Sequence, residues 1–282
     1  MLKYRVLTGG GFLSLVAALY IWGTTPLIGA VILGVTVLAV LEMVNMMTVA
    51  GYPALKWTCM GLILLWIAGV CFSESDVETW ESLPYVVPVI SVWVISLGCL
   101  FRSDQSQSLA KLAGSFMTLV YVAGLMQFMF MLLLSGQGGA DGRELLLYGI
   151  LVIKSTDMGA YFVGSAIGKH KMIPTISPAK TWEGVLGGVG VAIAVSSLLM
   201  YLFKYDLSGH NFTWIDGLIL GLGLAVLGVI GDLVESMLKR AAKIKDSGSW
   251  LKGMGGILDV LDSLIFALPL LYIYLCWGLH GL

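Results

Sequence analysis

Residues 214–235 read WIDGLILGLGLAVLGVIGDLVE, and this stretch decides the class of fold. The fifteen residues between Asp216 and Asp232 are all apolar or Gly. A helix that crosses a bilayer needs about 20 consecutive, mostly apolar residues, so the stretch predicts a transmembrane helix. The carboxylate of Asp232 at the end of such a helix needs a cation partner, either a lysine or a metal ion.

Eight more windows of the same kind extend this prediction to the whole chain. Of its 282 residues, 58% are hydrophobic and 12% are charged, which is far more apolar than an ordinary soluble domain. We therefore predict an all-α, polytopic transmembrane protein with about nine spans. The remaining windows are residues 8–23, 26–45, 57–73, 84–101, 113–134, 145–166, 184–203 and 257–279.

The basic residues predict how the chain is oriented in the membrane. If the N-terminus is cytoplasmic, thirteen of the sixteen Lys and Arg residues fall on the cytoplasmic side. Arg143 and Lys204 fall on the opposite side, and Lys154 lies inside a span. Cytoplasmic loops are enriched in Lys and Arg, so this asymmetry predicts an N-in, C-out topology with cytoplasmic loops at 168–183 and 240–256. The net charge of −1 leaves no basic footprint for nucleic acid.

Polar residues are unevenly distributed between the two halves of the chain. Residues 1–135 contain few of them and are predicted to be a scaffold of transmembrane helices. Residues 136–282 place ionisable side chains at membrane depth, where such groups are costly and mark functional sites by default. This half is therefore predicted to be the catalytic region. Glu42, in the first half, fits either an interfacial carboxylate or part of a site.

The window 145–166 and the loop after it contain the first group of candidate site residues. Lys154, Asp157 and Tyr161 are spaced i, i+3 and i+7, so they share one helix face. This spacing fits either a functional site or a structural ion pair. The loop supplies cationic and hydroxyl donors that suit a polyphosphate, although its lysines would also serve as simple topology signals. These donors include Lys169, Ser177, Lys180 and Thr181.

A second group follows the stretch quoted at the outset. Asp232, Ser236 and Lys239 are spaced i, i+4 and i+7, so an acid, a hydroxyl and a base lie on one stripe of the helix. The apolar run before Asp232 means that this carboxylate approaches the membrane interior. We expect a lysine or a metal ion beside it.

A third group lies at the start of the last window. Asp259 and Asp262 are spaced i, i+3 on its first turn, directly after Gly255 and Gly256. Free N–H groups at a helix N-terminus bind anions, and paired carboxylates suit a divalent cation such as Mg²⁺. The alternative is that the two carboxylates only stabilise the helix dipole, which is worth about 0.3–1 kcal/mol.

The residue motifs in these segments resemble those of the phosphatidate cytidylyltransferase family, whose members are also called CDP-diacylglycerol synthases. The family signature resembles residues 236–240 (SMLKR), 245–248 (KDSG), 255–259 (GGILD) and 262–263 (DS). A second block of the family resembles residues 156–164 (TDMGAYFVG), 168–171 (GKHK) and 176–184 (ISPAKTWEG). The resemblance covers about residues 150–265, with the motifs in the family's order.

The resemblance implies the reaction of CTP with phosphatidate to give CDP-diacylglycerol and pyrophosphate, in a bacterial inner membrane with the active site facing the cytoplasm. It implies Mg²⁺ held by Asp232 and Asp259, compatible with a second cation, and catalytic roles for Asp262 and Lys239. The expected partners are CTP, phosphatidate and membrane lipid, and a homodimer is compatible with it. The residues expected to contact substrate are Asp157, Tyr161, Lys169, Ser177, Lys180, Thr181, Ser236, Arg240, Lys245, Asp246, Ser247, Gly255 and Gly256.

The chain departs from the family's usual pattern at three positions. The family usually has His and Arg at the positions of Met254 and Val260, and proline at that of Lys252. The absence of an Arg removes a planar phosphate clamp, so a non-catalytic relative stays open as an interpretation. A CTP-dependent kinase or cytidylyltransferase acting on another lipid also fits the sequence and, from a different class of protein, so does an ion-coupled transporter.

Overall fold

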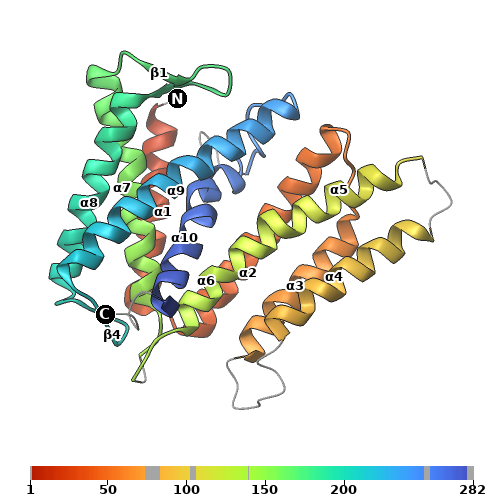
Figure 1. The fold of residues 1–282 in the computed structure, drawn as a ribbon, viewed down its shortest axis with the longest axis horizontal. Helices are drawn as coiled ribbons and strands as arrows, with labels where there is room; N and C mark the ends of the chain where they lie inside the picture. Colours follow the sequence, from red (N-terminus) through yellow and green to blue (C-terminus); the bar gives the residue numbers. More distant parts are fainter. Residues whose placement is uncertain (1, 74–82, 102–105, 139, 251–254, 278–282) are drawn as a thin grey trace. The chain divides into compact units, whose positions relative to one another are not determined.

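The computed structural model describes residues 2–73, 83–101, 106–138, 140–250 and 255–277, and most of these residues are helical. This confirms the predicted helical class (Figure 1). The helices are α1 (Leu2–Trp22), α2 (Thr25–Val49), α3 (Lys56–Ser73), α4 (Leu83–Leu100), α5 (Ser108–Thr118), α6 (Gly124–Leu134), α7 (Arg143–Ile167), α8 (Trp182–Leu202), α9 (Trp214–Ala241) and α10 (Leu258–Trp277), with a π-helical segment η2 (Leu119–Ala123) between α5 and α6.

The described residues also contain two short antiparallel hairpins, which the all-α prediction did not include. One pairs β1 (Lys171–Ile173) with β2 (Ser177–Thr181), and the other pairs β3 (Asp206–Leu207) with β4 (His210–Asn211). The first hairpin folds most of the predicted loop 168–183 into a defined shape.

Among the described residues, six helical segments are long and apolar enough to cross a membrane, which supports the transmembrane class. The apolar stretches of α3 and α4 are shorter, and α1 is not among the six. The count of nine spans and the N-in, C-out orientation therefore remain predictions. The six segments are Thr25–Val49, Ser108–Leu134, Arg143–Ile167, Trp182–Leu202, Trp214–Ala241 and Leu258–Trp277.

The chain forms two compact units, and helices α1, α2, α9 and α10 contribute residues to both. Unit 1 comprises Met1–Gly11, Pro26–Leu134 and Lys239–Asp259. Unit 2 comprises Phe12–Thr25, Ser135–Leu238 and Val260–Leu282. Unit 1 therefore contains the first half of α1, nearly all of α2, helices α3 to α6 and the described part of the loop 240–256.

Polar contacts stabilise the packing inside unit 1. The N–H of Leu55 donates to Ser115 Oγ (2.9 Å), and Trp66 Nε1 donates to Gln127 Oε1 (2.8 Å). A Cβ at Gly114 would lie 2.1 Å from the carbonyl oxygen of Tyr52. The connection between α2 and α3 therefore lies directly on α5, where only a glycine fits.

Glycines bring the helices of unit 2 into close contact, which is the usual way for membrane helices to pack. A Cβ at Gly159 of α7 would lie 2.8 Å from Val191 Cβ of α8, and one at Gly231 of α9 would lie 2.4 Å from the carbonyl oxygen of Asp262 of α10. Since Gly231 precedes Asp232, this contact brings α10 against α9 beside that carboxylate.

The two hairpins lie at opposite ends of α8, which is 21 residues long and so spans about 32 Å. The side chain of Thr181 caps the start of α8 by accepting from the N–H of Gly184 (3.2 Å). Glu183 accepts from the backbone N–H groups of Lys169 and His170 at 3.1 and 3.2 Å. These contacts tie the β1–β2 hairpin to the first turn of α8.

Candidate functional site

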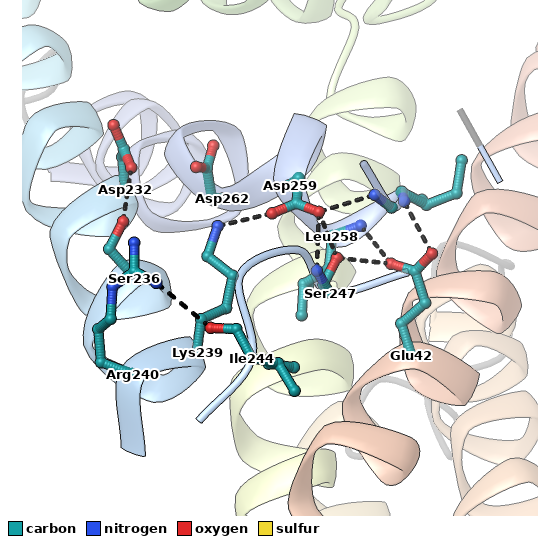
Figure 2. Close-up of polar contacts among 12 residues, drawn as sticks. Glu42, Asp232, Ser236, Lys239, Arg240, Ile244, Ser247, Leu258, Asp259 and Asp262 are labelled. Atoms are coloured by element: carbon teal, nitrogen blue, oxygen red, sulfur yellow. Dashed lines mark hydrogen bonds and ion pairs between the residues drawn. The ribbon is translucent and has the colours of Figure 1, made fainter. Parts of the chain in front are cut away.

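Asp259 lies in the first turn of α10, and four donor atoms lie within hydrogen-bond distance of its carboxylate in unit 1. Oδ2 accepts from the N–H groups of Gly256 (2.7 Å) and Ser247 (2.9 Å) and from Ser247 Oγ (2.8 Å). Oδ1 accepts from Lys239 Nζ (2.6 Å), and Figure 2 shows Lys239 pointing at Asp259. The two side chains of this ion pair are only 12% and 9% exposed. The structure thus brings together four of the predicted site residues.

Two glycines before α10 make this approach to Asp259 feasible. Gly255 has a φ of +92°, which side chains rarely adopt, and a Cβ there would lie 2.4 Å from Asp259 Oδ2. A Cβ at Gly256 would lie 2.3 Å from both Ser247 Oγ and Glu42 Oε2. Any larger residue at either position would displace the groups around Asp259.

Glu42 is the residue of this cluster that the sequence left undecided. It is 2% exposed and accepts from the N–H groups of Ile257 (2.9 Å) and Leu258 (2.8 Å). Ser247 Oγ lies 3.0 Å from Glu42 Oε2 and can donate its one hydrogen either to Glu42 or to Asp259. Figure 2 shows Ser247 between the carboxylates of Glu42 and Asp259. The only sequence signal was a carboxylate in an otherwise apolar window, which marked Glu42 as unusual without naming its partners.

Asp232 belongs to a cluster in unit 2, where Lys180 is its cation partner. Lys180 Nζ lies 2.9 Å from Asp232 Oδ2, and the same ammonium donates to the carbonyl oxygen of Val229 (3.3 Å). Ser236 Oγ donates to Asp232 Oδ1 (3.3 Å), one turn along α9. The predicted need of Asp232 for a cation is therefore met by a lysine that precedes α8.

Lys154 stands at the centre of the polar contacts between α7 and α10 in unit 2. Its Nζ donates to the carbonyl oxygen of Val260 (2.9 Å), to Ser263 Oγ (3.0 Å) and to Asp157 Oδ2 (3.2 Å). Asp262 is 7% exposed and is close enough to Lys154, Asp157 and Asp232 to interact with them electrostatically. The spacing of Lys154 and Asp157 fits either a functional site or a structural ion pair. The structure contains the ion pair, and the pair lies beside other predicted site residues.

Several predicted site residues lie outside these two clusters. Tyr161 is 66% exposed and contacts Phe162 edge to face, so it does not join its helix-face neighbours Lys154 and Asp157. Arg240 Nη1 donates to the carbonyl oxygen of Ile244 (3.4 Å). Lys169, Lys245 and Asp246 are exposed, and Ser177 is half-buried in β2. Lys252 and Met254 lie outside the described residues.

A further ion pair lies before α7, away from the predicted site residues. Arg143 donates through Nε (2.6 Å) and Nη2 (2.5 Å) to Asp141, and Thr25 Oγ1 donates to the same carboxylate (2.8 Å). The Arg143 guanidinium holds the pKa of Asp141 below its ordinary value, against a smaller opposing effect of burial. The pair is a useful control for the clusters described above.

The donor chemistry of the clusters is that of a hard cation site, although no assembled site is present. Among the described residues, no group of three or more His, Cys, Asp or Glu side chains has the arrangement of a metal site. Asp157, Asp232 and Asp262 nevertheless set three carboxylates against the ammonium groups of Lys154 and Lys180 in unit 2. Carboxylate oxygens are the ligands that Mg²⁺ prefers, so these residues fit the expected cation in chemical type.

Comparison with known proteins places the chain in a family. The sequence profile of the cytidylyltransferase family matches residues 3–277. A phosphatidate cytidylyltransferase of Staphylococcus haemolyticus is 33% identical over 276 residues, which cover 97% of this chain and 99% of that protein. The protein of that name from Bacillus subtilis is 33% identical over 281 residues, which cover 97% of this chain and 97% of that protein. The one from Staphylococcus epidermidis is 35% identical over 254 residues, which cover 90% of this chain and 90% of that protein. Since these matches run through nearly the whole sequence, the chain belongs to the cytidylyltransferase family.

Proposed function

We propose that this protein is a phosphatidate cytidylyltransferase, which converts CTP and phosphatidate to CDP-diacylglycerol and pyrophosphate in phospholipid biosynthesis. The observation that carries the proposal is the match to the Staphylococcus haemolyticus relative of that name over 97% of this chain and 99% of the relative. The related names favour this activity over a lipid kinase and over a transporter.

The reaction requires neutralised charge rather than a protein nucleophile. A phosphate oxygen of phosphatidate attacks the α-phosphorus of CTP, and a new P–O bond forms. The bond from that phosphorus to the β-phosphate oxygen breaks, and pyrophosphate leaves. Both reactants are anions, so fixed positive groups must hold them in line. We assign this role to Lys239 in unit 1 and to Lys180 and Lys154 in unit 2, because each ammonium is held beside a carboxylate.

Mg²⁺ is the cation that we propose for this reaction, with Asp232 and Asp259 as its ligands and Asp157 and Asp262 as further oxygen donors. Mg²⁺ commonly binds through one or two carboxylates together with substrate phosphates. The excess of three carboxylates over two ammonium groups in the unit 2 cluster supports a cation there. When bound, the ion would polarise the phosphates and offset the charge of the leaving pyrophosphate.

The expected assay result is cytidylyl transfer by purified protein in detergent micelles with phosphatidate. Labelled CTP should give a lipid-soluble labelled product, chelation should stop the reaction, and added Mg²⁺ should restore it. Diacylglycerol or a polyprenol in place of phosphatidate should give no product. A protein that binds CTP yet transfers nothing to any phospholipid acid would instead be a non-catalytic relative.

We further propose nine spans with the N-terminus and the active site in the cytoplasm of a bacterial inner membrane. The asymmetry of Lys and Arg supports this orientation. The exposed position of Trp182 at the start of α8 and of Trp214 at the start of α9 is consistent with helix ends at a membrane interface.

The two hairpins test the orientation because they flank a single predicted span. In a protein whose four cysteines are replaced by Ala, Asn211→Cys in β4 should react with an impermeant maleimide in intact cells. Thr175→Cys, at the tip of the β1–β2 hairpin, should react only after the cells are permeabilised. Both positions are exposed, whereas Ser247 is 8% exposed and would react poorly on either side. The opposite labelling pattern would reverse the topology.

A further inference from the structure

We propose that Glu42 is a positioning residue for the predicted active site, which acts by fixing Ser247 and the start of α10 so that Asp259 stays in one place. This inference rests on the proposed function, because Asp259 is one of the residues assigned to the reaction. It gives a role in the site to a residue of the N-terminal half, which is otherwise predicted to be scaffold.

Glu42, on helix α2, accepts hydrogen bonds from the first N–H groups of α10, which is the role that a capping residue next to the helix usually has. The first N–H groups of a helix have no partner within it, and a side chain next to the helix normally accepts from them. Here Oε1 accepts from Ile257 and Oε2 from Leu258, although Leu258 is 216 residues away in sequence. A buried carboxylate is costly unless its oxygens are satisfied. Two backbone N–H groups meet that need, together with the Ser247 hydroxyl, whose single hydrogen Glu42 shares with Asp259.

Ser247 connects this cap to the predicted catalytic carboxylate. Its hydroxyl lies 3.0 Å from Glu42 Oε2 and 2.8 Å from Asp259 Oδ2, and its N–H also donates to Asp259 (2.9 Å). A local cap would stabilise α10 without reaching Ser247. Glu42 contacts both, so a change at Glu42 should move the donors around Asp259.

Gly248 provides independent evidence that the chain is shaped around Glu42. The three atoms closest to a Cβ at Gly248 are all in the Glu42 side chain, with Oε1 at 2.2 Å, Cδ at 2.7 Å and Cγ at 3.1 Å. Gly248 is not among the glycines with positive φ. The missing side chain is therefore explained by the carboxylate of Glu42 and not by backbone conformation.

The first test is Glu42→Gln, which keeps the size of the side chain but presents an amide NH₂ to one of the three donors. Loss of a group that orients a metal ligand typically costs 10–100-fold in activity or metal affinity. We expect kcat to fall by about 10–100-fold and the Mg²⁺ concentration for half-maximal rate to rise by about tenfold. Glu42→Asp, which keeps the charge, should recover part of the loss.

The matched control is Glu144→Gln. Glu144 also accepts from a backbone N–H, that of Ser208 at 2.7 Å, but it lies at the start of α7 away from the predicted site residues. This variant should keep the kcat and the Mg²⁺ dependence of the wild type. Equal effects of Glu42→Gln and Glu144→Gln would reduce Glu42 to a general stabilising role and overturn the proposal.

Two further experiments test whether Glu42 makes these contacts: hydrogen exchange, which does not depend on turnover, and a double-mutant comparison. In Glu42→Gln, hydrogen exchange at the amides of Ile257 and Leu258 should become faster, while the peptides of α8 keep wild-type rates. Gly248→Ala should impair the enzyme, and Glu42→Asp should relieve that impairment because it shortens the side chain that the new methyl group meets. Unchanged exchange, or purely additive effects of the two substitutions, would contradict the inference. A wild type without cytidylyl transfer would overturn the proposed function alone, and the exchange result would still decide on Glu42.

Discussion

Asp259→Asn is expected to lower cytidylyl transfer by more than about 100-fold while the protein stays folded and membrane-inserted. The amide keeps an oxygen that can accept from Gly256 and Ser247, so the first turn of α10 should form. It loses the negative charge that holds Lys239 and that a divalent cation requires. Since even groups that only orient a metal ligand contribute 10–100-fold, removal of the proposed direct ligand should exceed that range. Initial rates over a series of Mg²⁺ concentrations, with a thermal unfolding curve of each variant, measure the effect.

Asp206→Asn is the control for this substitution. Asp206 is exposed in β3, and its carboxylate accepts a local hydrogen bond from the N–H of Gly209 (2.9 Å). It should keep normal turnover and normal Mg²⁺ dependence. Near-normal activity of Asp259→Asn with an unchanged Mg²⁺ requirement would remove Asp259 from the metal site, and Asp232→Asn can be judged by the same criterion.

The helices could be predicted from the sequence because each apolar window is a local property. The window 113–134, for example, lies inside the continuous helical run Ser108–Leu134, and only its polar beginning was missed. The β1–β2 hairpin could not be foreseen, because its strands are short and β2 contains Pro178, which argues against a strand. Its shape depends on tertiary contacts with α8, which no local pattern records.

The same limit applies to the candidate site. The pairing of Lys154 with Asp157 follows from helical spacing, and the structure contains it. The partners of Asp232 and Asp259, which are Lys180 and Lys239, lie on other elements. A sequence shows that a buried carboxylate needs a cation. Which of several lysines becomes its partner depends on how the helices pack.

Lys154 is expected to supply the positive charge that the family usually supplies with Arg at position 260. Val260 is 6% exposed, and its own carbonyl oxygen accepts from Lys154 Nζ at 2.9 Å. The ammonium is therefore held against the backbone of the residue that is usually an Arg in the family. It also faces Asp157 and Ser263, so the cluster retains a cation although residue 260 is apolar.

Lys154→Met should reduce both activity and stability, because it removes the cation nearest to Asp157 and Asp262. Loss of one partner of a buried ion pair costs about 3–5 kcal/mol. We expect a smaller cost here, since the Lys154 and Asp157 side chains are 20% and 40% exposed. Arg143→Met removes the cation of the pair with Asp141 and should lower the unfolding midpoint slightly with little effect on turnover, so it separates stability from activity.

Val260→Arg tests whether the two cations occupy the same place. In the wild-type background the new guanidinium would meet the ammonium of Lys154, and two like charges in a poorly solvated cluster repel each other. We therefore expect Val260→Arg alone to lower turnover, although it restores the family's usual residue. In Lys154→Met the same substitution should raise turnover by about one to two decades, since a charge-assisted hydrogen bond contributes about 1.5–3 kcal/mol. If each single variant is impaired and the double variant is more active than Lys154→Met, the sign of the coupling identifies Lys154 as the substitute for the missing Arg. Additive losses in the double variant would show instead that Lys154 and residue 260 act independently.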